Sequence, residues 1–352
     1  FDTGTDDIRS EVLEGVMTIT LNRPERRNAM SSAMLKGLVA SLADAETASD
    51  VGAVLLTGAG GAFCAGGDIA KLYHKGRAGD FTDVHAFWRE EYRLNSLIHH
   101  YPKPYIGFLQ GYVMGGGVGI SCHGSHRIVG NTTKMAMPEC AIGLVPDVGG
   151  SYLLARAPGL TGRFLGITGY RMNAADALHA GFADCFIAED RWSRVIEELV
   201  SAGTPDPLSN FIDNAGHSQL ATMQIEIDQI FTHFNPDLMA TEQAKGRGEL
   251  AQMITSALAK NAPLSMMAVD AMLDRLGPDC TFQQALEMEY RFPSRAMQQG
   301  EFLEGTRAML IDKDKKPDWQ YKTASEVPKG LIDEMLAPTA FTQAFLATGE
   351  GL

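Results

Sequence analysis

Two acidic residues lie in an apolar, glycine-rich stretch that spans residues 137–156 (MPECAIGLVPDVGGSYLLAR). Glu139 and Asp147 are too far apart in the chain to share one helix face, so a turn must bring them together. Burial among apolar neighbours raises the pKa of a carboxyl group and suits it to proton transfer. Each acid taken alone is equally well explained as an exposed loop acid, and Asp147 also as the N-cap of a helix starting at Gly149.

Two glycine-rich turns follow short apolar runs. The sequence FCAGGDI (63–69) comes after the apolar run 53–56, and the triplet at 115–117 comes after the run 105–109. The glycine stretches at 58–61 and 115–119 do not complete the G-x-G-x-x-G spacing of a dinucleotide loop, and no Walker A loop is present. One such turn is usually a simple strand-to-helix connection. Two in one α/β core can direct backbone N–H groups at a single oxygen, which is the geometry of an oxyanion hole.

Other reactive side chains are weaker candidates. Ser121 and His123 stand in GISCHG, which is not the G-x-S-x-G pattern of a nucleophile elbow. His123 and His126 have no acid or cysteine at a suitable spacing for a metal, so we expect no metal site.

Composition excludes several classes of partner. The net charge of −13 leaves no excess of basic surface for nucleic acid. No apolar run approaches the roughly 18 residues of a membrane span, and the acidic start of the sequence (1–7) does not resemble a secretory signal. The cysteines are five in number and form no CxxC pair, so we expect reduced thiols in a cytoplasmic protein.

Hydrophobic periodicity predicts an α/β chain with two regions. We expect an α/β core over residues 1–190 and a helical region over 191–352. Ser31 should cap a helix whose apolar face consists of Leu35, Leu38, Val39 and Leu42. The predicted strands are 16–21, 53–57, 105–109, 126–129 and 135–137, and the other predicted helices are 149–155, 192–201, 219–231, 243–260 and 282–299.

The order of these motifs resembles the crotonase (enoyl-CoA hydratase/isomerase) superfamily. The matching blocks are NRP…NA (22–29), FCAGGD (63–68), GGGVG (115–119) and MPE…GLVPDVGG (137–150). Within the superfamily, REEYRLN (89–95), EMEYR (287–291) and EFLEGTRAMLIDKDKKPDW (301–319) resemble the 3-hydroxyisobutyryl-CoA hydrolases. The resemblance implies a crotonase-type spiral of ββα units with a C-terminal helical region. That region would complete the site and supply the contacts of a homo-oligomer, a trimer or a hexamer.

The resemblance also implies roles for individual residues. The N–H groups of Gly67 and Gly116 would hold the thioester oxygen of an acyl-CoA, and Glu139 would act as base or nucleophile. Hydratases carry a second glutamate at the position of Gly119, and they have glycine where the hydrolases and this chain have Asp147. Substrate contacts would come from Glu91, Gly66, Asp68, Ile69, Arg26, Ala29 and Ala65.

The implied reaction is hydrolysis of a short β-hydroxyacyl-CoA, such as 3-hydroxyisobutyryl-CoA in valine catabolism. The alternatives are an enoyl-CoA hydratase/isomerase of fatty-acid oxidation and a non-catalytic protein that binds CoA esters. No cofactor is expected, since CoA is part of the substrate. Basic residues that could receive its phosphates are Arg23, Arg26, Arg27, Lys71, Lys75 and Arg77. The sequence does not determine which short β-hydroxyacyl group the substrate carries. Two acyl groups that differ by one methyl differ in binding free energy by only about 1–3 kcal/mol in an apolar pocket.

Overall fold

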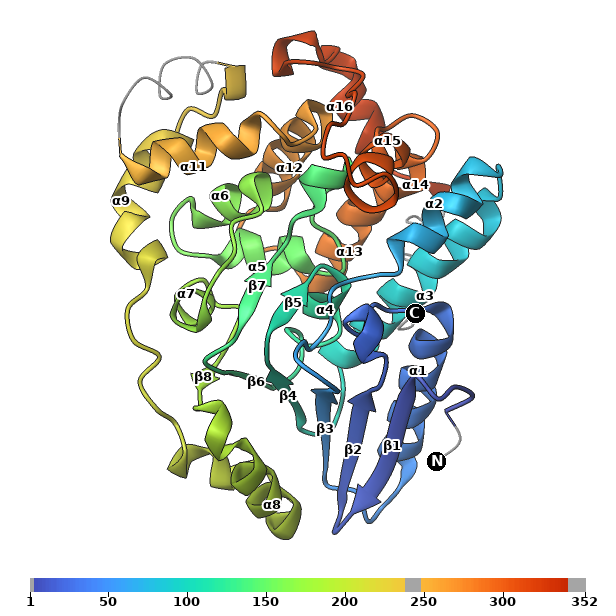
Figure 1. Ribbon diagram of the computed structural model, residues 1–352, viewed down its shortest axis with the longest axis vertical. Coiled ribbons are helices and arrows are strands. Elements are labelled where there is room, and N and C mark those ends of the chain that lie inside the picture. Colours follow the sequence, from blue (N-terminus) through green and yellow to red (C-terminus); the bar gives the residue numbers. More distant parts are fainter. Residues whose placement is uncertain (1–2, 238–247, 341–352) are drawn as a thin grey trace.

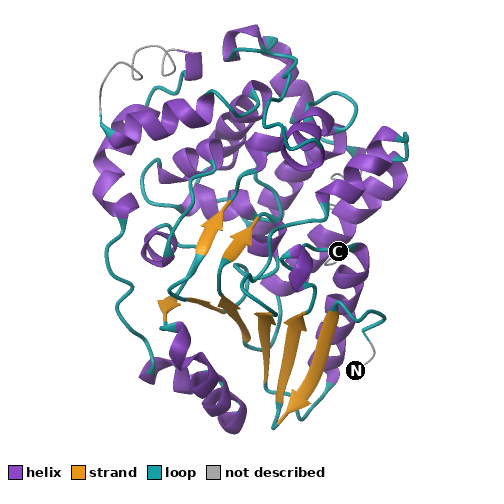
Figure 2. Ribbon diagram, in the orientation of Figure 1, coloured by secondary structure: helices purple, strands orange, loops and turns teal. Residues whose placement is uncertain are grey.

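The computed structural model describes residues 3–237 and 248–340, and it divides into a strand-rich part and a helical part (Figures 1 and 2). The strands are β1 (Ile8–Leu13), β2 (Val16–Leu21), β3 (Ala53–Gly58), β4 (Tyr105–Leu109), β5 (Tyr112–Met114), β6 (His126–Val129), β7 (Lys134–Ala136) and β8 (Cys185–Phe186). The helices up to the last strand are α1 (Ser32–Thr47), α2 (Ile69–Arg77), α3 (Phe81–His99), α4 (Gly116–Gly119), α5 (Gly150–Arg156), α6 (Thr161–Thr168) and α7 (Ala174–His179). The later helices are α8 (Trp192–Ala202), α9 (Gln219–Phe231), α11 (Glu249–Leu258), α12 (Pro263–Leu276), α13 (Phe282–Arg291), α14 (Pro293–Ala296), α15 (Phe302–Thr306) and α16 (Lys329–Met335).

The main sheet has the strand order β1-β2-β3-β4-β6-β8. Only the β1–β2 pair is antiparallel, and every later pair is parallel. Strands β5 and β7 form a second, two-stranded parallel sheet. Because parallel neighbours need a crossover, each return of the chain carries a helix or a long loop, and these crossovers supply the site residues.

Side chains alternate between the two faces of the main sheet. In β3, Val54 and Leu56 join the large core that includes α1 and the later helices, whereas Ala53 and Leu55 join a smaller core. The smaller core is closed by α8, whose Val195 packs there, and Figure 1 shows α8 apart from the other late helices at the lower end of the sheet. Strands buried on both faces explain why these runs are continuously apolar.

The two glycine turns are brought together by backbone pairing. Cys64 and Val113 form a parallel bridge, and the Met114 N–H donates to the Cys64 carbonyl at 3.0 Å. The turn after β3 therefore runs beside β5 and reaches the start of α4. This pairing places Gly66 and Gly67 next to Gly115 and Gly116.

Most expected elements are confirmed, with small shifts. The strands predicted at 16–21, 105–109 and 126–129 have those bounds, and the Ser31 side chain accepts a hydrogen bond from the Met34 N–H at the start of α1. The strand expected at 135–137 begins one residue earlier, and the helix expected at 149–155 begins at Gly150.

Two expectations need correction, and a third lies partly outside the described residues. Val39 does not belong to the buried face of α1, because its side chain is 39% exposed, whereas Leu35, Leu38 and Leu42 are buried. The helix expected over 282–299 is divided into α13 and α14, because Pro293 lacks the N–H that would continue the first helix. Of the helix expected over 243–260, residues 243–247 lie outside the described residues.

The described strands end at Phe186, and the regular elements described beyond it are helical (Figure 2). The division into domains 1–190 and 191–352 stays a prediction. Within the described ranges, none of the helices has the length and apolar character that crossing a membrane requires.

Asn28 holds the segment between β3 and the first glycine turn by side-chain hydrogen bonds. Its side chain is fully buried, and its Nδ2 donates to the carbonyl oxygens of Ala59, Ala62 and Phe63 at 2.9–3.1 Å. We expect Asn28→Ala to lower the free energy of unfolding by about 2–3 kcal/mol, because buried carbonyls lose their donors. Urea unfolding measures the loss. Asn22→Ala, which removes one bond to the Asp6 carbonyl, is the control and should cost less than about 1 kcal/mol. Equal losses in the two variants would contradict this account.

Candidate active site

One cavity of about 470 Å³ contains every residue that the sequence predicted for the site. It lies between the two glycine turns, α3, the 139–147 segment and the C-terminal segment that follows α15. The predicted residues that line it are Arg26, Ala29, Ala65, Gly66, Gly67, Asp68, Ile69, Glu91, Gly116, Glu139 and Asp147. The structure therefore brings these residues together at one cavity, and their roles stay predictions.

The two glycine turns meet backbone to backbone. A Cβ atom added to Gly116 would lie 3.3 Å from the Gly67 nitrogen and 2.7 Å from Glu91 Oε1. Gly66 has φ +103°, a conformation that L side chains rarely adopt. Within the described ranges, no protein oxygen accepts a hydrogen bond from the N–H of Gly67 or of Gly116. Both donors are therefore available to a ligand oxygen in the cavity.

Four carboxyl groups line the cavity: Asp68 is partly exposed and paired with Arg23, and the other three are buried. Glu91 is 3% exposed, and Glu139 and Asp147 are each 6% exposed. Glu91 Oε1 and Glu139 Oε2 have no hydrogen-bond partner among the described residues. None of the three carboxylates takes part in an ion pair in that part of the chain. They face the cavity with spare accepting capacity.

Burial dominates the electrostatics of these acids. It raises the pKa of Glu139 well above its ordinary value, and the negative charge of Asp147 raises it further. Burial and Asp147 likewise raise the pKa of Glu91, and burial raises the pKa of Asp147 to about 7. Neighbouring carboxyl groups of this kind share protons, so one can be ionised while another is protonated near neutral pH.

Asp147 does not cap the helix that follows it. The N-cap residue of α5 is Gly149, and the helix has no side-chain cap at this position. The Asp147 carboxylate instead accepts a hydrogen bond from the Tyr92 hydroxyl at 3.3 Å and lies on the cavity wall. The alternative of a simple N-cap is therefore wrong.

Gly119 has no room for a side chain. An added Cβ would lie 2.6 Å from Val148 Cβ and 2.8 Å from Asn95 Nδ2, and both residues are fully or almost fully buried. The space that a second glutamate would need is filled by the residue that follows Asp147.

The C-terminal segment closes the cavity with Met309, Leu310 and Lys313. Spacing in the sequence did not place these residues, although they belong to the block 301–319 that carried the family resemblance. They stand on a π-helical turn, Arg307–Ile311, and on the loop after it. Trp88 of α3, packed against Phe302 of α15 with ring centroids 5.9 Å apart, adds an apolar wall that the sequence also did not predict.

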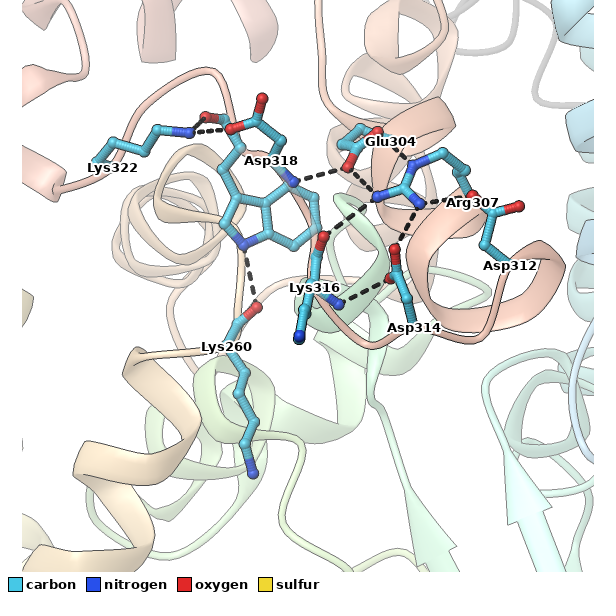
Figure 3. Close-up of polar contacts among 9 residues, drawn as sticks. Lys260, Glu304, Arg307, Asp312, Asp314, Lys316, Asp318 and Lys322 are labelled. Atoms are coloured by element: carbon cyan, nitrogen blue, oxygen red, sulfur yellow. Dashed lines mark hydrogen bonds and ion pairs between the residues drawn. The ribbon is translucent and has the colours of Figure 1, made fainter.

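Arg307 holds this segment in shape (Figure 3). Its guanidinium donates to Glu304 at 2.7 and 2.9 Å, to Asp312 at 2.6 Å and to Asp314 at 2.8 Å. Glu304 also accepts from the Asp318 N–H at 2.6 Å, so one arginine and one glutamate fold the loop back on its helix. Lys313 is thereby positioned beside the cavity.

A basic groove adjoins the cavity and shares Arg26, Asp68 and Ala70 with it. Its other basic residues are Arg23, Lys71, His74 and Lys75. Arg23 is paired with Asp68 at 3.0 Å, and Lys75 with Asp83, whereas Arg26 and Lys71 form no ion pair within the described ranges. Arg27 lies over the Tyr112 ring, and Arg77 lines a different depression, so these two are poorly placed for a ligand of this groove.

Comparison with known proteins gives consistent matches over most of the chain. A family described as enoyl-CoA hydratase/isomerase matches residues 16–336. Curated relatives named "3-hydroxyisobutyryl-CoA hydrolase, mitochondrial" include one from Xenopus laevis, 36% identical over 328 residues, covering 90% of this chain and 84% of the relative. Another, from Homo sapiens, is 34% identical over 322 residues, covering 88% of this chain and 83% of the relative.

Two solved structures resemble nearly the whole chain. An enoyl-CoA hydratase from Rhodobacter sphaeroides superposes with a TM-score of 0.91 and 42% identity, covering 96% of this chain and 99% of the other. A carnitinyl-CoA dehydratase from Mycobacterium thermoresistibile has a TM-score of 0.91 and 34% identity, covering 98% and 100%. The names of these similar proteins divide between hydrolase and hydratase or dehydratase, so the choice depends on the site.

The raised pKa of Asp147 predicts a pH-dependent effect on stability. The folded protein binds a proton at Asp147 more tightly than the unfolded chain does, so this group destabilises the fold as pH rises from about 4 to about 7. Asp147→Asn removes that penalty. We expect its stability relative to the unsubstituted protein to be higher at pH 8 than at pH 5, by at least about 1.4 kcal/mol.

Urea unfolding at the two pH values measures this difference. Asp44→Asn, at an exposed position on α1, is the control and should show the same relative stability at both. A pH-independent effect of Asp147→Asn would show that the buried carboxyl carries no such penalty.

Proposed function

The chain belongs to the enoyl-CoA hydratase/isomerase family, and on this basis we propose that it hydrolyses a short β-hydroxyacyl-CoA thioester. The proposed substrate is 3-hydroxyisobutyryl-CoA, the compound in the names of the curated relatives. The fold is the crotonase-type α/β fold expected from the sequence, as its structural neighbours have it.

One observation carries the choice of hydrolysis. Glu139 and Asp147 line the same cavity, while position 119 is a glycine with no space for a side chain. Hydration of a double bond in this superfamily uses a glutamate at that position beside the one matching Glu139. This chain has an aspartate at 147 instead, and Val148, next to it, fills the space.

The proposed chemistry begins at the thioester carbonyl. Its oxygen accepts hydrogen bonds from the N–H groups of Gly67 and Gly116, which stabilise the negative charge that develops on that oxygen. Each such donor is typically worth about 2.7–4 kcal/mol in the transition state. Glycine is required at 116, because an added Cβ would lie 2.7 Å from Glu91 Oε1.

Glu139 supplies the base. Its ionised carboxylate takes a proton from water, the water oxygen bonds to the carbonyl carbon, and the carbon–sulfur bond then breaks. The departing sulfur takes up a proton, so the products are a free hydroxy acid and CoA. A buried carboxylate with a raised pKa is a stronger base than an exposed one, which suits this step near neutral pH.

The same geometry also serves a covalent route, in which Glu139 attacks the carbonyl and water cleaves the resulting anhydride. In both routes, we propose that Asp147 and Glu91 orient the substrate hydroxyl and the attacking group. Tyr92 fixes Asp147 from α3 through its hydroxyl.

The basic groove is proposed to receive the phosphates of CoA. It adjoins the cavity at Arg26, and Arg26 and Lys71 are its cations without an ion pair in the described ranges. A local patch of this kind is needed because the chain has a net charge of −13. No cofactor is proposed, because CoA is part of the substrate. Within the described residues, no group of three or more His, Cys, Asp or Glu side chains could hold a metal ion.

The free cysteines bear on the compartment in which the protein works. All five cysteines are unpaired, which fits a reducing compartment. The cytoplasmic location expected from the sequence stays a prediction, since the curated relatives are named as mitochondrial. A trimer or hexamer also stays a prediction.

A panel of short acyl-CoA esters tests the reaction. We expect thiol release from β-hydroxyacyl-CoA esters, detected with a thiol reagent, and much slower hydration of crotonyl-CoA, detected by loss of its conjugated absorbance. Rapid hydration with no thiol release would establish the hydratase alternative. Tight binding of the esters with neither reaction would establish a binding protein.

Glu139→Gln keeps the size of the side chain and removes its basicity. We expect kcat for thiol release to fall by about 10²–10⁴-fold, because the general base is lost, or by more if Glu139 is the nucleophile. Glu90→Gln is the matched control, since Glu90 does not line the cavity and pairs with Lys36 of α1 at 3.8 Å. Retention of most of the activity by folded Glu139→Gln protein would remove this residue from the chemistry.

The double substitution Arg26→Ala with Lys71→Ala tests the phosphate groove. We expect KM for the CoA ester to rise about tenfold, while KM for the corresponding pantetheine thioester stays the same because it lacks the nucleotide phosphates. Lys36→Ala, an exposed lysine of α1, should change neither value. A parallel rise of both KM values would place the effect in the acyl site instead.

A further inference from the structure

Glu289 is a fully buried acid that the proposed reaction does not use. It lies in α13, inside the EMEYR block, and its side chain is 0% exposed. A buried carboxylate is costly unless it is well hydrogen-bonded. Its partners therefore indicate what the residue does.

The Glu289 carboxylate is bound entirely by the turn after Asp147. Oε2 accepts from the Gly149 N–H at 2.8 Å, and Oε1 accepts from the Ser151 N–H at 2.8 Å and from the Ser151 hydroxyl. These groups are about 140 residues away in the chain. A single side chain of α13 thus holds the end of the turn that follows Asp147 and the first turn of α5.

The backbone of this turn is strained and needs such support. Val148 has φ +54°, which is unfavourable for a β-branched residue, and Gly149 has φ +79°. The Val148 carbonyl lies 2.8 Å from His123 Nε2, a contact that a neutral ring with its proton on Nε2 makes as donor. Burial lowers the pKa of His123 to about 3, so the ring is neutral at working pH.

We propose that Glu289 is a positioning residue for Asp147, holding the 147–151 turn so that the Asp147 carboxyl faces the cavity. This inference rests on the proposed hydrolysis. The same arrangement explains why position 149 is glycine: an added Cβ would lie 2.5 Å from both His123 Nε2 and Phe282 Cε2. Phe282 is the first residue of α13, so this helix contacts the turn at two points.

Where Glu289 is ionised, it also acts through its charge. The titratable groups coupled to it are Asp147 on the turn, Glu139 on the preceding segment and Tyr92 on α3. Glu289 contributes to the raised pKa of Glu139 and of Tyr92, and Asp147 in turn helps burial to raise the pKa of Glu289 to about 8. Removal of the charge at 289 should lower the pKa values of the cavity acids.

Glu289→Gln tests both effects. We expect kcat for thiol release to fall by about 10–100-fold, with KM changed less than about threefold. We also expect the acidic limb of the pH–rate profile to move to lower pH by at least about half a pH unit. A residue with a structural role alone would lower stability without moving that limb.

Two further variants separate position from charge. Ser151→Ala removes one hydrogen bond to Glu289 and keeps its carboxyl group, so kcat should fall about three- to tenfold, and the acidic limb should move less than in Glu289→Gln. Glu287→Gln is the matched control on the same helix, because Glu287 bonds to Gln283 and does not contact the turn. It should leave kcat within about twofold and the limb unmoved.

A double-substitution cycle measures the coupling between Glu289 and Asp147 through stability, without an activity assay. The pH-dependent stability effect of Asp147→Asn is measured with Glu and with Gln at position 289. If Glu289 positions and charges the environment of Asp147, that effect shrinks in the Gln background, even in a protein that hydrolyses nothing. Failure of the proposed function would appear as absent thiol release in the unsubstituted protein.

The proposal is overturned if folded Glu289→Gln keeps the normal kcat and acidic limb, or if the cycle shows no coupling between the two acids. Should Glu289→Gln fail to fold, Ser151→Ala decides: a normal kcat in that variant overturns the proposal, and the stated fall supports it.

Discussion

Burial of four carboxyl groups near one cavity is the constraint on which the rest of this structure depends. Glu91, Glu139, Asp147 and Glu289 are at most 6% exposed, and none forms an ion pair within the described ranges. Transfer of such groups from water costs several kcal/mol each unless hydrogen bonds or protonation compensate. The fold supplies a large apolar core, and the acids respond with raised pKa values.

The four acids meet this constraint in different ways. Glu289 is satisfied by three hydrogen bonds from Gly149 and Ser151 at the start of α5, and Asp147 accepts one from Tyr92. Glu91 and Glu139 each keep an oxygen without a partner in the described part of the chain. Among these four acids, the carboxylate oxygens without a hydrogen-bond partner are thus those that line the cavity, where a substrate would lie. The fully hydrogen-bonded carboxylate, Glu289, does not line the cavity. This distribution fits a site that gains interactions when a ligand binds.

The glycines and the C-terminal segment follow from the same arrangement. Gly115 and Gly116 have no side chain because a Cβ at either would meet a carboxyl oxygen, of Glu139 or of Glu91, at 2.7 Å. The cavity is then completed from about 190 residues further along the chain by the loop that Arg307 folds back (Figure 3). Long crossovers of a parallel sheet allow such distant segments to meet at one place.

The sequence by itself determined the local features: the strand and helix periods, the Ser31 cap, the glycine turns and the apolar setting of Glu139 and Asp147. With the family resemblance, it also named eleven residues that line one cavity, although it missed Trp88, Met309, Leu310 and Lys313. These features depend on near neighbours in the chain, which a pattern records. The sequence pattern wrongly assigned Val39 to the buried face of α1. A helical period shows which face of a helix is apolar, but it does not show how much of that face is covered by other elements. Only the tertiary structure decided that Asp147 faces a cavity and caps no helix, that Gly119 is closed by Val148 and Asn95, and that Glu289 and Trp88 belong to the surroundings of the site. Those outcomes depend on contacts between distant segments, and the sequence carries no local signal for which distant side chains meet.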